Sequence, residues 1–190
     1  MRSLGVAVAV AAMYAAPLRA EPTIELAAGM ATPIAGDTWT TDVDTGWKLA
    51  GRGTSDVGGL PAIVSIEWGR MPSGPCPRGF DRFRVTAGLT GYWPVGAAFA
   101  VSARVAVGLD AVMCGTASMS VPALPQTKDW FDFGLAGEAA ATLWLYEGVV
   151  DVGVELGLPV SLHWQEGSAT VPALDYLGLD LDVLLAVRMR

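Results

Sequence analysis

Apolar side chains recur at every second residue along segment 99–113, and this period restricts the possible folds more than any other feature of the chain. The residues between them are mostly small or charged: Ala100, Ser102, Arg104, Ala106, Gly108, Asp110 and Val112. A β-strand places successive side chains on opposite faces, whereas a helix would mix the two sets. The segment is therefore predicted to be a strand with one apolar face.

The same alternation recurs in seven further segments, clear in the first three and weaker in the others: 131–145, 150–162, 177–187, 24–32, 60–68, 82–93 and 46–52. The last of these is the poorest candidate, because only Trp47 and Leu49 lie on its apolar side. Eight such segments predict an all-β protein built from antiparallel, up-and-down strands.

The first twenty residues have the pattern of a secretory signal peptide. Arg2 gives a basic start, an apolar stretch follows over residues 4–16, and the small residue Ala20 suits a cleavage site after it. An ordinary N-terminal core helix is the alternative. We expect residues 1–20 to be a signal peptide and residues 21–190 to be one domain, in which no run of about 18 apolar residues predicts a spanning helix.

The second face of the strands distinguishes a membrane barrel from a soluble one. A soluble lipocalin-like barrel turns its apolar face inward, so its other face meets water and carries many polar residues. Here the other face is mostly Gly and Ala with isolated charges of both signs. Small residues and paired charges suit the narrow lumen of a small barrel whose apolar face lies in lipid. A transmembrane β-barrel is favoured, with a soluble lipocalin-like barrel or sandwich as the alternative.

The connections between the segments alternate in length. The first, third, fifth and seventh are long and the others are short: 33–45, 53–59, 70–81, 94–97, 114–128, 146–148 and 163–175. Bacterial outer-membrane barrels have long extracellular loops and short periplasmic turns. The alternation supports segment 46–52 as a strand, which gives an even count of eight.

Aromatic residues gather near the predicted strand ends. The expected girdle has four Trp residues at the outer ends and two at the periplasmic ends: Trp47, Trp68, Trp130, Trp164, Trp93 and Trp144. Tyr92 and Tyr146 are expected to join the periplasmic set. Rings with one polar edge favour the interface between membrane and water.

These features together resemble the small outer-membrane β-barrel families of Gram-negative bacteria, typified by the OmpA transmembrane domain and OmpX. The resemblance covers residues 21–190 and rests on the signal peptide, eight alternating segments and a closing strand from 177 to 189. It implies a porin-like monomer in the cell outer membrane, with outer-membrane lipid and the assembly machinery as partners. Such barrels usually end in an aromatic residue that this machinery reads, whereas this chain ends in Arg188-Met189-Arg190.

The parity of the strands directs many charged side chains into the lumen: Glu25, Lys48, Arg52, Glu67, Arg82, Arg84, Arg104, Asp110, Asp132, Glu138, Asp151, Glu155, Asp180, Asp182 and Arg188. An eight-stranded barrel is just wide enough for side chains to fill. We expect salt-bridge networks that plug the lumen, since unpaired buried charges are costly. A proton or ion path, or a gate, is the alternative function of these residues.

His163, the single histidine, lies near the predicted outer end of its strand and is expected at the membrane interface. A lipid hydrolase built on His163 and Ser168 is the alternative, although the sequence has no nucleophile elbow. No His or Cys pair has the spacing of metal ligands, so neither a metal nor a cofactor is expected. The loop residues Asp37, Asp42 and Asp44 could ligate Ca²⁺, but Asp is also common in solvated turns.

Cys76 and Cys114 both fall in predicted outer loops. An exported protein with two cysteines usually oxidises them to one disulfide. We expect a Cys76–Cys114 bridge, with two free thiols as the alternative if the Cα atoms lie too far apart.

Charge and fold limit the possible functions. A formal net charge of −7 argues against nucleic-acid binding. The leading hypothesis is a non-enzymatic barrel with a plugged polar lumen, which has a structural or surface-interaction role through its extracellular loops. A narrow channel or carrier of small apolar compounds, an envelope lipid hydrolase and a soluble periplasmic carrier remain alternatives.

Overall fold

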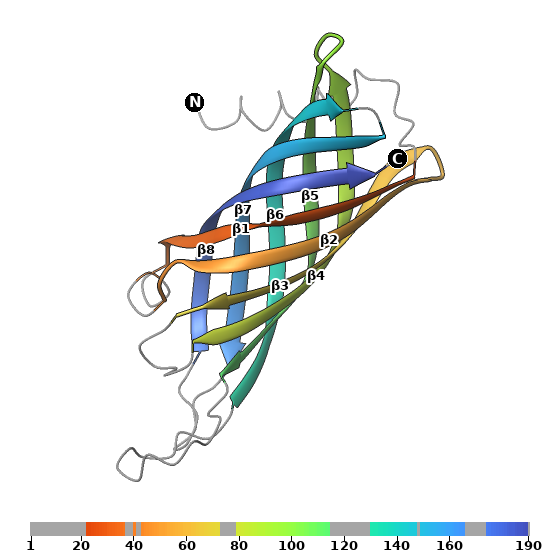
Figure 1. Cartoon of the computed structure of the whole chain (residues 1–190). Helices are drawn as coiled ribbons and strands as arrows, with labels where there is room; N and C mark the ends of the chain where they lie inside the picture. Colours follow the sequence, from red (N-terminus) through yellow and green to blue (C-terminus); the bar gives the residue numbers. More distant parts are fainter. Residues whose placement is uncertain are drawn as a thin grey trace, which may run out of the picture.

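A computed structural model describes residues 22–36, 40, 43–72, 79–114, 130–147, 149–165 and 174–189. Its strands, in chain order, are β1 (Thr23–Ala35), β2 (Gly46–Val57), β3 (Leu60–Met71), β4 (Phe80–Pro94), β5 (Phe99–Cys114), β6 (Trp130–Glu147), β7 (Val150–Gln165) and β8 (Leu174–Met189). Each strand pairs with the next, and antiparallel pairing of β8 with β1 closes the barrel (Figure 1). The predicted all-β class and the eight-stranded antiparallel barrel are confirmed. Within the described ranges, no helix has the length and apolar character to span a membrane.

The strand β2, which has the weakest alternation, is a complete strand of 12 residues. The prediction that residues 53–59 form a connection is wrong, because pairing with β3 continues to Val57↔Leu60. Only Gly58 and Gly59 remain in the turn, and their φ angles of 64° and 86° suit a two-residue type I′ hairpin. Residues 54–56 are polar and interrupt the apolar alternation, so the sequence does not indicate that the strand continues through them.

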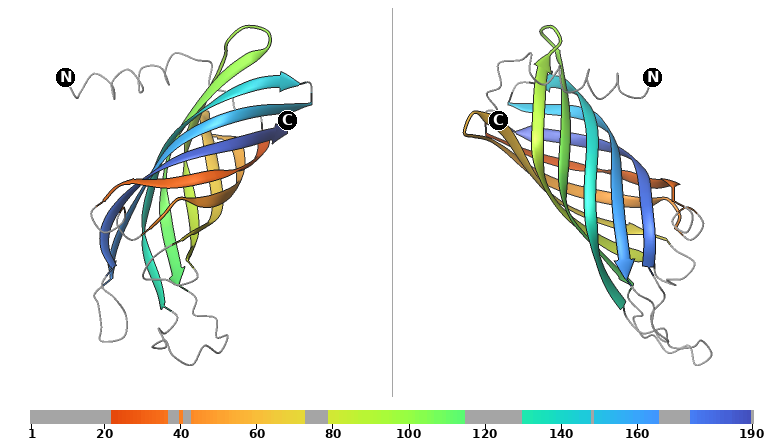
Figure 2. Two further views of the ribbon diagram at one scale, coloured as in Figure 1. Left: turned by 60° about the vertical axis from the view of Figure 1, so that its left-hand side comes forward. Right: turned by 180° about the vertical axis from the view of Figure 1, so that it is seen from behind.

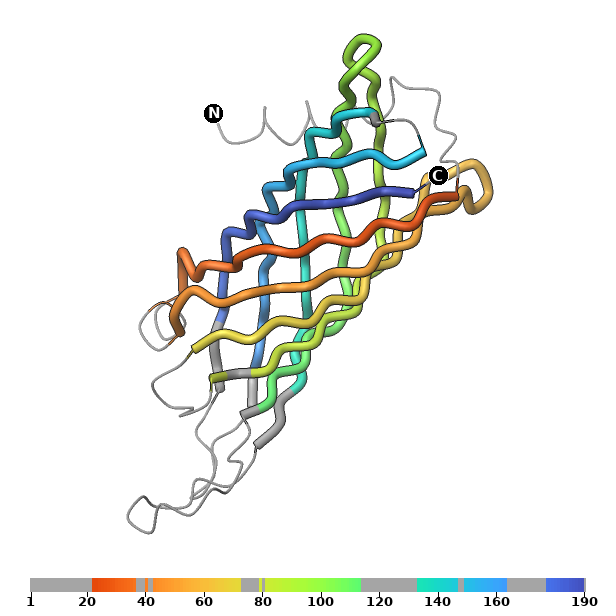
Figure 3. Tube along the Cα trace, viewed as in Figure 1, coloured from red at the N-terminus to blue at the C-terminus, as the bar shows by residue number. Residues whose placement is uncertain are grey.

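The two ends of the barrel differ in their connections. The β2–β3 and β4–β5 turns, the start of β1 and the end of β8 lie together at one end, which we call the turn end (Figures 1 and 3). The opposite end, where the odd-numbered strands finish, is the loop end. At the turn end the β4–β5 hairpin extends beyond the other turns (Figure 2). The Val95 N–H closes this hairpin by donating to the Phe99 carbonyl at 2.8 Å.

The outer surface of the barrel is apolar over most of its height. All eight strands expose large apolar side chains, and Val107 and Leu185 are 69% and 66% exposed. Of the exposed side chains that the structure describes, only those of Asp44, Asp56 and Arg70 are charged, and all three lie in a loop or near a strand end. The apolar face predicted from the alternation therefore points outward, and the small and charged residues point into the lumen.

Candidate functional site in the barrel lumen

A cluster of charged side chains links five strands in the middle of the lumen. Arg104 donates from Nη1 to Glu155 Oε2 at 2.7 Å and from Nη2 to Glu138 Oε1 at 2.6 Å. Arg52 forms a two-bond pair with the same Glu155, at 2.8 and 2.9 Å. Glu25 lies 4.0 Å from Arg52. Strands β1, β2, β5, β6 and β7 are thus joined through buried side chains.

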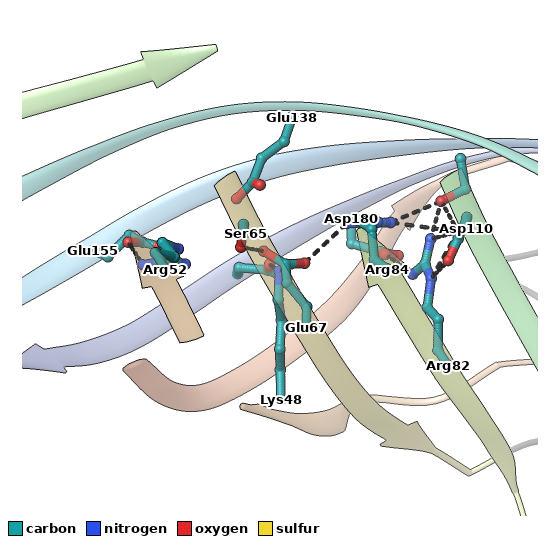
Figure 4. Close-up of polar contacts among 12 residues, drawn as sticks. Lys48, Arg52, Ser65, Glu67, Arg82, Arg84, Asp110, Glu138, Glu155 and Asp180 are labelled. Carbon is teal, nitrogen blue, oxygen red and sulfur yellow. Dashed lines mark hydrogen bonds and ion pairs between the residues drawn. The ribbon is translucent and has the colours of Figure 1, made fainter. Parts of the chain in front are cut away.

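Lys48 organises a second group nearer the loop end. Its Nζ lies 2.7 Å from Glu67 Oε2 on β3 and 2.5 Å from Asp182 Oδ2 on β8, across the lumen. Ser65 donates to the other oxygen of Glu67 at 3.2 Å. Arg84 lies 3.6 Å from Glu67 and connects this group to the next one. Figure 4 shows Lys48, Ser65 and Glu67 between the Arg52–Glu155 pair and the arginines of β4.

Arg82 on β4 holds the third group. Its guanidinium donates to both oxygens of Asp110, at 2.7 to 3.0 Å, and to Asp180 Oδ2 at 2.5 Å. Ser161 accepts hydrogen bonds from Arg82 and Arg84 and donates to Asp110 Oδ2 at 2.6 Å. Charge-assisted bonds of this kind are roughly twice as strong as neutral ones. They tie β4, β5, β7 and β8 together through the lumen (Figure 4).

The predicted lumen charges are buried wherever their side chains are described: Glu25, Lys48, Arg52, Glu67, Arg82, Arg84, Arg104, Asp110, Glu138, Asp151, Glu155, Asp180, Asp182 and Arg188. The side chain of Asp132 lies outside the described part of the chain. A buried charge is tolerated when it is paired, and losing one partner leaves the other uncompensated. Each of these buried charges is therefore stabilised by the opposite charges next to it.

His163 is fully buried in the lumen, so the prediction that it lies at the membrane interface is wrong. Its Nε2 lies 3.4 Å from Asp110 Oδ2, the same oxygen to which Ser161 donates. Gly134 on β6 leaves room for the imidazole, because a Cβ at this position would overlap the ring. The Ser161 hydroxyl is directed to the carboxylate instead of to the histidine, which is not the arrangement of an activated nucleophile.

Apolar side chains also lie in the lumen, on the turn-end side of the Lys48 group. A cluster that we call the aromatic plug consists of one ring, one leucine and four alanines from five strands: Ala27, Ala50, Ala100, Trp144, Leu184 and Ala186. The prediction that Trp144 belongs to the girdle is wrong, because its side chain is fully buried and its indole N–H donates to Ser102 Oγ at 2.8 Å. Leu143 and Leu145 face outward on the same strand, so the alternation directs Trp144 inward.

Arg188 covers the aromatic plug on its turn-end side. Its guanidinium carbon lies 4.2 Å from the ring centre of Tyr92 and 4.5 Å from that of Trp144. The same group donates to Asp151 Oδ2 at 2.5 and 3.0 Å and to the Tyr92 hydroxyl at 2.7 Å. The Tyr92 and Tyr146 hydroxyls are 2.5 Å apart. Both tyrosines pack against the plug, which corrects their predicted place in the periplasmic girdle.

Three aromatic rings form a row on the outer surface at the loop end of β2, β3 and β4. Trp47 and Trp68 are each 39% exposed and meet edge to face with ring centres 4.7 Å apart. Phe83 stacks on Trp68 at 6.2 Å and extends this row. Trp93 is partly exposed near the turn end, where its ring covers Gly91. The side chains of Trp130 and Trp164 lie outside the described residues.

Several other predictions also fall outside the described residues. They concern residues 1–20, Asp37, Asp42, Ser168, Cys76 and the side chain of Cys114. The signal peptide and the disulfide therefore remain predictions. In the described ranges, no group of three His, Cys, Asp or Glu side chains has the arrangement of a metal site.

The lumen has little free space around the Lys48 and Arg82 groups. A cavity of about 20 Å³ lies there, lined by Lys48, Glu67, Arg84, Asp180 and Asp182 among others. One water molecule needs a cavity of about 10–15 Å³ by the same measure, so this cavity is large enough for one. It is much smaller than the pockets of about 300–1,000 Å³ that bind small organic ligands.

Comparisons with known proteins support the fold and do not indicate a specific function. No family model matches the sequence, and no curated protein matches it. Among solved structures, Neisserial surface protein A aligns with a TM-score of 0.60 at 9% identity, covering 88% of this chain and 96% of that protein. The N-terminal β-barrel domain of Pseudomonas aeruginosa OprF has a TM-score of 0.47 at 10% identity and the same coverage. The attachment invasion locus protein Ail of Yersinia pestis has a TM-score of 0.47 at 11% identity, covering 90% of this chain and 100% of Ail. All three are eight-stranded outer-membrane β-barrels, and the alignment with Neisserial surface protein A confirms the predicted resemblance in fold.

Proposed function

We propose that this protein is a monomeric outer-membrane barrel that anchors its long loops at the cell surface and takes part in surface interactions through them. The observation that carries the proposal is the outer surface, where the described strands expose almost only apolar side chains between their ends. Soluble monomers rarely expose apolar patches larger than a few hundred Å². In a closed barrel the backbone N–H and C=O groups of every strand are paired within the sheet. A protein that spans the membrane needs this pairing, because lipid offers no hydrogen-bond partners.

The contents of the lumen favour an anchor over a carrier or an enzyme. Apolar solutes need a cavity far larger than the 20 Å³ between Lys48 and Asp182. A lipid hydrolase needs a histidine that substrate can reach, whereas His163 is buried beneath the contacts of Asp110. The connections at the loop end are longer than the turns, and long loops are where such barrels meet the medium.

Cell fractionation tests the location of the protein. We expect the protein in the outer-membrane fraction, resistant to carbonate extraction, and shifted in mobility between unboiled and boiled gel samples. Recovery from the aqueous periplasmic fraction without detergent would contradict the proposal and favour the soluble barrel.

An epitope tag tests the orientation and the role of the loops. A tag inserted in segment 115–129, which joins β5 to β6, should bind antibody on intact cells. The same tag after Ala97, in the β4–β5 turn, is the matched control and should react only after the outer membrane is permeabilised. The opposite pattern would contradict the orientation. If loop deletion leaves binding of the cells to surfaces and host proteins unchanged while the barrel is retained, the interaction role fails.

A further inference from the structure

The apolar outer surface is short on β2 and β3. On β3 the outward side chains are uncharged over residues 60–68, and this run ends at the exposed charge of Arg70. On β2 they are uncharged over residues 47–55, and the exposed Asp56 follows. A strand rises about 3.3 Å per residue and is tilted by about 40° in such barrels, so each run is about 20 Å high. We call these two outward faces the short wall.

Strands β5 and β6 present a much taller apolar face. The outward side chains of β5 are uncharged over residues 99–113, and those of β6 over residues 133–145. The same rise and tilt give heights of about 35 Å and about 30 Å. Phe99 is 47% exposed at the turn end of this face, and Phe133 is 59% exposed at its loop end. We call these two outward faces the tall wall.

The extra height of the tall wall lies at both ends of the barrel. At the turn end, the β4–β5 hairpin extends beyond the other turns (Figure 2), and no residue from 85 to 103 is charged. At the loop end, β6 reaches farther from the turns than β2 or β3 does (Figure 1). Tilting the whole barrel does not remove the inequality, because a tilt lowers the height of both walls across the membrane together.

Neither wall matches the membrane. The apolar band of outer-membrane barrels is about 25 Å tall, so the tall wall exceeds it by about 10 Å and the short wall falls about 5 Å below it. A bilayer adapts by thickening beside a long apolar surface and by thinning beside a short one, at a modest cost for each ångström. Trp47 and Trp68 lie at the loop end of the short wall, where such rings favour the interface. Arg70, beyond them, belongs among the polar headgroups.

Given the membrane location proposed above, we infer that this barrel holds the surrounding bilayer at two thicknesses, thinned at the short wall and thickened at the tall wall. Lipid is the occupant that suits the whole tall wall, because its apolar face continues without a charge from the membrane core to both ends. Long, extended acyl chains then cover Phe99 and Phe133. Shorter or more disordered chains surround the short wall.

Tryptophan probes in brominated lipid test this inference. The background has Phe at all seven tryptophan positions, and each variant carries one new probe: Phe99→Trp, Phe133→Trp or, in the middle of the tall wall, Val107→Trp. The vesicles contain dimyristoyl phosphatidylcholine mixed with brominated phosphatidylcholine. We expect both end probes to be quenched at least about half as strongly as Val107→Trp, because thickened lipid covers them. Weaker quenching of either end probe would overturn the inference.

A matched probe tests whether the two walls differ. Val57, which follows Asp56 at the turn end of the short wall, is 63% exposed. Val57→Trp should be quenched less than about half as strongly as Phe99→Trp, because thinned lipid does not reach it. A smaller difference between these two probes would mean a bilayer of uniform thickness and would overturn the inference.

The reference probe separates this inference from the proposed location. If Val107→Trp is quenched and the end probes are not, only the unequal thickness is refuted. If Val107→Trp is not quenched either, the barrel does not face lipid, and the proposed location fails together with the inference. A second copy of this chain is the other possible occupant of the tall wall. End-probe quenching that is weak at high protein density and rises when the protein is diluted with lipid would assign the wall to that copy and overturn the inference.

Single cysteines provide a second measurement if the tryptophan-free background does not fold. In a Cys76→Ser/Cys114→Ser background, Phe99→Cys and Phe133→Cys should resist a water-soluble maleimide as Val107→Cys does, whereas Asp56→Cys should react. A labelling rate of either end residue closer to that of Asp56→Cys than to that of Val107→Cys would overturn the inference. Each variant must retain the heat-dependent gel shift of wild type.

Discussion

The loop-end and turn-end parts of the lumen are enclosed by the same eight strands but are filled in opposite ways. Toward the loop end, Lys48 and Arg82 bridge carboxylates from strands on both sides of the barrel. Toward the turn end, Trp144 and Leu184 pack on alanines, and a single arginine covers them. The first part is held by directional bonds between charges, and the second by close packing of apolar atoms.

This difference shows how a narrow barrel can be filled without a conventional hydrophobic core. The large apolar side chains of the described strands are mostly exposed on the outer surface, and only a few of them, such as Trp144, Leu184 and Met71, are buried. Elsewhere the lumen must use paired charges, whose desolvation offsets much of their attraction. The two parts should therefore respond differently to loss of a single side chain.

The largest effect is expected from removing a shared cation in the charged part. Arg104→Met leaves Glu138 without its ion-pair partner and Glu155 with Arg52 alone. A buried charge left without its partner costs about 3–5 kcal/mol. Urea titration of the protein refolded in lipid vesicles should show this loss in the free energy of unfolding. A loss below about 1 kcal/mol, the usual range of exposed pairs, would mean that this part is not held by its ion pairs.

Loss of packing in the aromatic plug should follow in size. Leu184→Ala creates a cavity within the buried apolar cluster, and such changes in packed interiors cost about 2–5 kcal/mol. The neighbouring Leu185→Ala, on the lipid-facing surface, leaves no internal cavity and should cost clearly less in the same urea titration. Equal losses for the two leucines would contradict the distinction between the plug and the outer surface.

A smaller effect is expected where charge is kept but geometry changes. Arg188→Lys keeps a cation near Asp151 but loses the planar group that stacks on Tyr92 and Trp144. Stacking of this kind contributes about 1–2 kcal/mol when it is shielded from water. A shift of that size in the midpoint of unfolding is expected, together with a change in Trp fluorescence. No change in either measurement would show that Arg188 acts as a point charge only.

The smallest effect is expected at the exposed ion pair near the loop end of β3 and β4. Arg70 forms a two-bond pair with Asp81 at 2.6 and 2.9 Å, but nearly half of its side chain is exposed. Exposed pairs contribute about 1 kcal/mol or less. Arg70→Ala should therefore leave the urea midpoint almost unchanged, and a loss as large as that of Arg104→Met would break the comparison between buried and exposed charges.

The sequence predicts the fold and the face of most residues because both depend on the local period of two. It predicts inward charges such as Arg104 and Glu155 for the same reason. The sequence misleads near strand ends, where the position of a residue suggests an interface although its parity directs the side chain inward. Trp144 and His163 both lie near strand ends, which suggested an interface, yet their neighbours on the same face are Thr142 and Ser161, both buried. Parity applied to every residue would have placed them correctly.

Which charges pair across the lumen is a property that local pattern does not contain. Arg82 and Asp180 are 98 residues apart and meet because of the tilt and closure of the barrel. The register between strands follows from the turns, and one of these, Gly58–Gly59, was predicted too long. A shift of two residues in register changes every cross-lumen partner and keeps each side chain on its face, whereas a shift of one residue reverses the faces.

Quenching of tryptophan fluorescence by brominated lipid tests the central claim most directly. Two variants each keep one of the seven tryptophans, Trp68 or Trp144, and have Phe at the other six positions. Trp68 is 39% exposed on the outer surface, and Trp144 is fully buried in the plug. The account predicts strong quenching of Trp68 and little quenching of Trp144 in vesicles of brominated phosphatidylcholine. Equal quenching of the two residues, or stronger quenching of Trp144, would contradict a barrel that faces lipid with its apolar surface and buries Trp144 in its lumen.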